Sequence, residues 1–145
     1  MTARYASLIV CLLLVGALTV FPGCGGEPEE PEFVISDENF EIFQDGRHVY
    51  GVKVTGTIRN VGNVDVSDVV LTGECPSCST SIRDGQWFLM EFKRDEQKDF
   101  IRFLGRGERQ DFSFEGLAYY RTGGGDPPDE MPGDVRVVVE SYEID

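Results

Sequence analysis

Apolar and polar residues alternate along several short stretches of this 145-residue chain. In the stretch 50–60, Tyr50, Val52, Val54 and Ile58 fall on one side, and polar or small residues fall on the other. A period of two with many β-branched residues is typical of a strand with one buried face. The same pattern predicts strands at 33–43, 50–60, 68–73, 87–93, 99–103, 111–115 and 135–140, with Val54, Ile58, Phe112 and Val137 in the core and Thr57 and Ser113 facing outward.

Turn-forming residues separate these predicted strands, at 45–46, 62–63, 84–85, 105–107 and in the long loop 123–133. Outside the N-terminal segment, no stretch of ten or more residues follows the 3.6-residue period of a helix. About seven short strands with turns between them predict an all-β fold, an antiparallel β-sandwich.

The first 23 residues have a different pattern. Arg4 precedes an apolar run at 8–20, and Gly23 and Cys24 follow shortly after it. A basic start, a short apolar core and a small residue before the break are typical of a secretory signal. An uncleaved anchor helix over about residues 5–21 is the alternative, at the short limit for crossing ~30 Å of hydrocarbon. Both interpretations place the rest of the chain outside the cytoplasm, because the positive charge precedes the apolar run.

The cysteine after this break resembles the lipobox of prokaryotic lipoproteins, although Phe21 and Pro22 stand where that family prefers Leu and Ala or Ser. The resemblance implies that the Cys24 thiol carries a diacylglyceryl group and becomes the new N-terminus. The expected product is a lipoprotein anchored to the membrane through its lipid. A fully released protein is a third option, which would leave Cys24 as a free thiol.

The segment after Cys24 predicts a spacer. Residues 25–32 comprise two glycines, two prolines and four glutamates, which favour an extended, solvated chain. We therefore divide the chain into a signal at 1–23, a linker at 24–32 and a domain at 33–145. Without residues 1–23, which carry one of the 13 basic residues and none of the 26 acidic ones, the net charge is −14. Such acidity disfavours binding to nucleic acid or to anionic lipid headgroups.

Two stretches resemble the signature of FxLYD and CARDB-like domains: residues 56–71, and the turn at 104–108 followed by Phe112 and Phe114. These domains are Ig-like sandwiches common in prokaryotic surface proteins and lipoproteins. The resemblance implies an Ig-like sandwich here, and it says little about a ligand. In the turn of the first stretch, we expect Asn60 to hydrogen-bond the backbone and Gly62 to adopt a positive φ.

Cys75-Pro76-Ser77-Cys78 is the one motif with reactive potential. A thiol–disulfide site is one interpretation, because two cysteines three apart can close a redox ring. Oxidoreductases place this motif at the start of a helix, however, and here it ends a predicted strand. A structural disulfide in an oxidising compartment is the favoured interpretation.

Other chemistry finds little support in the sequence. His48 is the only histidine, so neither a Ser/His/Asp arrangement nor a four-ligand zinc site can be argued. The loop 123–134 gathers four carboxylates, but its spacing lacks the order of a calcium-binding EF-hand loop. We expect a solvated loop, no cofactor, no metal and no enzymatic activity.

An exposed patch is a further possibility. By strand parity, Trp87 and Leu89 face away from Phe88, and Leu117 and Tyr119 face away from their own neighbours. If both pairs share one exposed sheet face, they would form an apolar patch that contacts a partner. Loops or the N-terminal strand could instead cover them.

Together these features predict a membrane-anchored, extracytoplasmic, non-catalytic domain that binds or scaffolds a protein partner at the cell surface. The alternative is an extracytoplasmic thiol-redox or metal-binding accessory protein that uses Cys75 and Cys78.

Overall fold

The computed structural model describes residues 29–145, so the predicted signal, Cys24 and the first part of the linker lie outside the described residues. About half of the described residues lie in strands, and the only helix among them is one short 3-10 turn. The elements are β1 (Phe33–Gln44), β2 (Val49–Asn60), β3 (Val66–Glu74), β4 (Trp87–Phe88), η1 (Asp95–Gln97), β5 (Lys98–Leu104), β6 (Arg109–Phe114), β7 (Tyr119–Arg121) and β8 (Arg136–Ile144).

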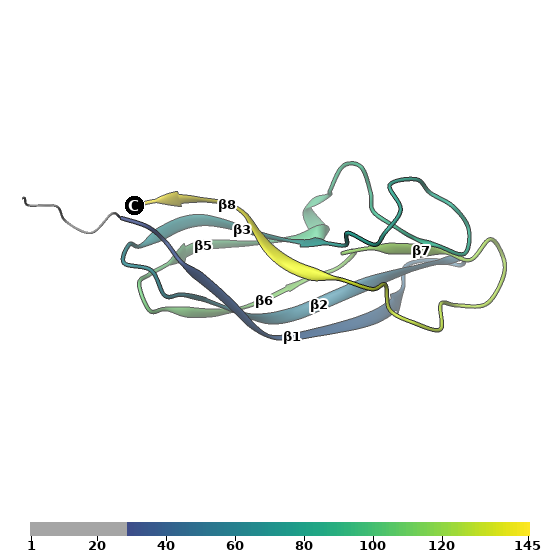
Figure 1. Ribbon diagram of the computed structural model, residues 1–145, viewed down its shortest axis with the longest axis horizontal. Coiled ribbons are helices and arrows are strands. Elements are labelled where there is room, and N and C mark those ends of the chain that lie inside the picture. Colours follow the sequence, from purple (N-terminus) through teal and green to yellow (C-terminus); the bar gives the residue numbers. More distant parts are fainter. Residues whose placement is uncertain (1–28) are drawn as a thin grey trace, which may run out of the picture.

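These strands form two antiparallel sheets, which confirms the predicted all-β sandwich. In the first sheet the order is β1-β2-β7-β4, and β6 also pairs with β2. The long β2 pairs with β7 over residues 49–51 and with β6 over residues 54–59. The second sheet has the order β5-β3-β8. Figure 1 shows β3, β5 and β8 as one layer over β1, β2 and β6.

The core fills the space between the layers. The side chains of Val54 and Ile58 on β2, Phe112 on β6 and Val137 on β8 are all buried, as their alternation predicts. Val66, Val69 and Leu71 of β3, in the same sheet as Val137, meet the side chains of β2 and β6 from the opposite layer. Each large apolar side chain buried in this way contributes about 1.5–3 kcal/mol to folding.

Two details of the strand prediction were wrong. Thr57 is buried although it faces outward, because on the central strand β2 it lies between Ser36 and Asp111, and its hydroxyl donates to Asp111 Oδ1 at 3.1 Å. Ser113 on β6, the other residue predicted to face outward, is exposed as predicted. The predicted strand 87–93 shortens to β4, since the chain then turns away and leaves Phe92 80% exposed.

The described chain has two dissimilar ends, which Figure 1 shows at opposite extremes of its long axis. At the N-terminal end, the residues before β1 lie against the β2–β3 turn, with hydrogen bonds from Val61 N to Glu32 O (2.7 Å) and from Asn63 N to Glu30 O (3.3 Å). The fold thus begins at Glu30, slightly before the predicted boundary. At the loop end lie the β1–β2 turn, residues 75–86 and the long loop 122–135.

The structure requires a glycine at position 62, but not for the positive φ that the sequence led us to expect. Its φ is not positive. A Cβ at this position would instead come within 2.6 Å of Glu30 O and 2.7 Å of Pro31 Cα. Glycine is required here because the incoming chain passes directly over it.

Candidate functional site

The loop end is built around a disulfide that follows β3. Cys75 and Cys78 are bonded to each other, with their Cα atoms 5.3 Å apart, which confirms the predicted pairing. Cys78 N donates to Cys75 O at 3.0 Å and closes a tight turn. Cys75 is only 2% exposed and packs in the core, whereas Cys78 is partly exposed. The disulfide therefore fixes the point at which the chain leaves the sandwich.

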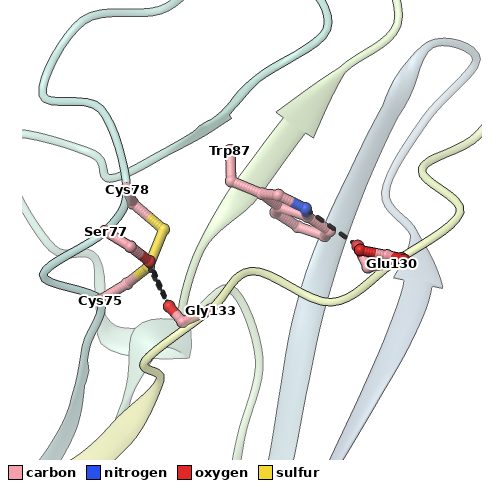
Figure 2. The surroundings of a disulfide bond; sticks show 6 residues. All are labelled: Cys75, Ser77, Cys78, Trp87, Glu130 and Gly133. Atoms are coloured by element: carbon pink, nitrogen blue, oxygen red, sulfur yellow. Dashed lines mark hydrogen bonds between the residues drawn. A yellow bond between two sulfur atoms is a disulfide. The ribbon is translucent and has the colours of Figure 1, made fainter.

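This turn is joined to the long loop between β7 and β8. The Ser77 hydroxyl donates to the carbonyl oxygen of Gly133, and Cys75 Sγ lies 3.7 Å from the same oxygen. Figure 2 shows the Ser77 hydrogen bond beside the disulfide. Two segments more than fifty residues apart are thereby held together at one place.

Trp87, at the start of β4, makes a second connection to the same loop. Its indole Nε1 donates to Glu130 O at 3.1 Å. The ring also packs edge-on against Tyr120 of β7, with centroids 5.4 Å apart, because the two residues are directly paired across the strands. The indole is partly exposed and lies between the disulfide and Glu130 in Figure 2. Its orientation is thus fixed from two sides.

The four-residue apolar patch predicted from parity was wrong. Leu117 and Tyr119 are 2% and 4% exposed, so they belong to the interior. Gly116 adopts a φ of 74°, which breaks the alternation between β6 and β7. Leu117 then fills the space beside Gly73, and the Tyr119 ring lies over Gly116.

The hydroxyl of Tyr119 already has a hydrogen-bond partner within the domain. The Arg94 guanidinium lies 3.3 Å from the hydroxyl oxygen. Burial raises the pKa of Tyr119 above its ordinary value, although the nearby Arg94 acts in the opposite direction. Of the predicted patch, Trp87 and Leu89 alone remain partly exposed.

Two shallow grooves flank Trp87. The first, which we call the Gln86 groove, has a volume of about 430 Å³ and is lined by Ser77, Cys78, Ser79, Gln86, Trp87, Pro132 and Gly133. The second, the Tyr120 groove, has a volume of about 380 Å³ and is lined by Trp87, Tyr120 and residues 128–133. Trp87, Pro132 and Gly133 belong to both, so the grooves adjoin.

Sequence reasoning missed Gln86, Tyr120 and Pro132 as members of a site. Nothing in their local sequence marks them, because the grooves form only where loops from distant parts of the chain meet. The Asp84–Gly85 turn correctly predicts a reversal, and Gly85 has a φ of 75°. That turn places Gln86 beside Trp87, but it does not reveal which loop lies opposite.

The described residues offer no group suited to metal chemistry. Within 29–145, no three His, Cys, Asp or Glu side chains lie close enough together to hold a metal ion. In the same part of the chain, no helix has the length and apolar character needed to cross a membrane.

In comparison with known proteins, no family, no curated protein and no solved structure matches the chain.

Proposed function

We propose that this chain is a membrane-anchored, extracytoplasmic lipoprotein whose non-catalytic domain binds another cell-surface component through its loop end. The observation that carries the proposal is the position of the two ends. The chain enters the domain at one end, and the disulfide, Trp87 and both grooves lie at the other.

The link to the membrane would be short. Glu30 is already hydrogen-bonded to the fold through Asn63, and five residues separate it from Cys24. At ~3.3–3.6 Å per extended residue, such a spacer reaches less than about 25 Å. A lipid on Cys24 would therefore keep the N-terminal end near the bilayer and leave the loop end free. Loops at the free end of a rigid sandwich are a common place for binding residues.

Cysteine substitutions in the full chain test the anchor. We expect the native chain to partition into detergent and to carry a diacylglyceryl mass, and Cys24→Ser to remain unprocessed and held by its apolar run. Cys11→Ser is the matched control, because Cys11 lies inside the predicted signal, and it should be processed normally. Identical mass and processing in the native chain and Cys24→Ser would overturn the anchor.

A thiol-redox role for Cys75 and Cys78 is the second candidate, favoured by the formed disulfide and by the partial exposure of Cys78 in a groove. Against it, the residues that follow form a parallel bridge between Ser79 and Phe88 rather than a helix that would stabilise a thiolate. Alkylation of the reduced chain across pH separates the two candidates. A strongly acidic Cys78 thiol supports the redox role, and an ordinary thiol supports the structural one.

A further inference from the structure

We propose that the Gln86 groove binds a neutral carbohydrate, with a sugar ring against the indole of Trp87. The proposal rests on the function above and gives its loop end a ligand class. Its first support is the chemistry of the lining: none of the seven side chains of this groove is charged. The chain as a whole carries a net charge of −13, and 27% of its residues are charged. A neutral polar ligand fits such a lining better than an ion does.

The second support is the tryptophan. A sugar ring is amphipathic, since its C–H groups form apolar faces and its hydroxyls project around the rim. An indole offers a broad apolar surface with a polar edge. Here the polar edge is already satisfied by Glu130 O, and the ring is held against Tyr120. The exposed part of Trp87 is therefore left for apolar contact.

The third support is a free amide beside that surface. Gln86 is exposed, and within residues 29–145 its side chain makes no hydrogen bond. An amide can donate and accept at once, which matches neighbouring sugar hydroxyls. The Ser79 hydroxyl, on the same groove, donates to Ser81 O at 2.9 Å and accepts from Ser81 N at 3.0 Å, which leaves one lone pair for a sugar hydroxyl.

The groove is also held in shape before any ligand arrives. The disulfide, the Ser77 hydrogen bond to Gly133 and the Trp87 hydrogen bond to Glu130 connect its walls, as Figure 2 shows. Fixed walls reduce the entropy lost on binding. The adjoining Tyr120 groove adds Tyr120, Asp129 and Glu130. Carboxylates accept hydrogen bonds from sugar hydroxyls, so a chain of several sugar units can extend past Trp87.

Intrinsic fluorescence tests the proposal directly, because Trp87 is the only tryptophan of the chain. The full chain in detergent would be titrated with cellotetraose, maltotetraose, mannotetraose and chitotetraose up to about 10 mM, a range that detects weak binding. We expect a saturable change in Trp87 emission with at least one tetrasaccharide. Loss of the Gln86 amide in Gln86→Ala should weaken the affinity about 3- to 10-fold, as for one neutral hydrogen bond.

The matched control is Gln44→Ala, which removes an exposed glutamine outside the groove and should leave the affinity unchanged. Both glutamines are exposed, and Gln44→Ala removes only a surface hydrogen bond to Gly46 O at 2.8 Å, so neither variant should unfold the domain, and both melting temperatures would be checked. The absence of a saturable response to all four sugars overturns the proposal. So does equal binding by Gln86→Ala and the native chain, or a response to tetraproline but to no sugar. None of these results bears on the Cys24 test, so failure of the ligand class is distinguishable from failure of the anchor.

Discussion

The two ends of the sandwich are held together in different ways. At the N-terminal end, Asn60 is fully buried, and its amide donates to Val64 O at 2.7 Å and Leu104 O at 3.2 Å while its oxygen accepts from Gly62 N at 3.0 Å. The main chain of Asn60 also exchanges hydrogen bonds with Gly107 and Glu108 of the β5–β6 turn. One buried residue thus joins the β2–β3 turn, the β5–β6 turn and the ends of β2 and β5.

The loop end has no comparable buried polar residue at its centre within the described chain. Its connections are a disulfide, backbone hydrogen bonds such as Ser79 N to Trp87 O at 2.9 Å, and the Asp84–Arg121 ion pair. Side chain-to-backbone hydrogen bonds at exposed or partly exposed positions, such as Ser77 to Gly133 and Trp87 to Glu130, complete them. This difference indicates where the chain tolerates substitution. Changes at Asn60 should affect the whole fold, whereas changes around Trp87 should affect the grooves and leave the sandwich intact.

Both ends share one hydrophobic core, and its disruption in Phe112→Ala should have the largest effect on the free energy of unfolding. Phe112 is buried and packs over Gly56, so its truncation should reduce the free energy of unfolding by about 3–5 kcal/mol. Ser113→Ala, at the exposed neighbouring position, should change it by about ±0.5 kcal/mol. Urea unfolding of both variants is the measurement. Similar losses at the two positions would contradict the register of β6.

Asn60→Ala should come next, with a loss of about 2–4 kcal/mol. The substitution leaves the buried carbonyls of Val64 and Leu104 without this donor. A buried group left unsatisfied costs about 1–3 kcal/mol, and the lower half of that range applies to each because a carbonyl oxygen has a second lone pair. Asn39→Ala is the control, because Asn39 is exposed and bonds only Glu41. If Asn60→Ala and Asn39→Ala unfold at the same urea concentration, the buried hydrogen bonds of Asn60 do not stabilise the fold.

Removal of the disulfide should have a smaller and more local effect. Cys75→Ser combined with Cys78→Ser opens a loop of four residues, which should cost no more than ~2 kcal/mol. We expect the double variant to remain folded, with a modest decrease in Tm and an unchanged far-UV circular dichroism spectrum. Unfolding at room temperature would show that the loop end is as important to the fold as Asn60.

The smallest effect concerns the pH dependence of the N-terminal end. A hydrogen bond from the Arg106 backbone N–H, at 2.8 Å, lowers the pKa of Asp65 below its ordinary value, helped by the Arg106 charge. A carboxyl with a lowered folded pKa contributes stability above its unfolded pKa and loses it as the pH falls through the folded pKa. Asp65 should therefore contribute near neutral pH, and its contribution should begin to decline as the pH falls below about 4, the ordinary pKa of an aspartate.

A carboxyl titration by NMR would measure this pKa. Because the backbone hydrogen bond is the largest cause, Arg106→Ala should leave most of the lowering in place. A return of the Asp65 pKa to its ordinary value in Arg106→Ala would show that the side-chain charge dominates instead.

The sequence was informative about the N-terminal end. Alternation over β2 correctly placed Val54 and Ile58, and the expected hydrogen bond from Asn60 to its own turn is present. Such features are local: a strand's period and a short turn depend on residues close in sequence. The reason for Gly62 was not predictable, because it depends on contact with residues 30–31, which the sequence pattern treats as linker.

The loop end was much less predictable. Strand alternation wrongly placed Leu117 and Tyr119 on an exposed face, because one residue, Gly116, changes the chain direction between two short strands. The disulfide could be predicted from the spacing of Cys75 and Cys78, from their position after a strand rather than before a helix, and from the expected oxidising compartment. The grooves could not, since they depend on the contact of the long loop with Ser77 and Trp87, which lie more than forty residues away in the sequence.

Amide hydrogen exchange of the full chain, before and after reduction of the disulfide, tests the central difference between the two ends most directly. The account predicts slow exchange at Val61, Gly107 and Glu108, whose amides are hydrogen-bonded around Asn60, in both states. Reduction should accelerate exchange at the loop end alone, first at Cys78 and Ser79. Equal acceleration at both ends, or faster exchange at Gly107 than at Ser79 in the oxidised chain, would contradict it.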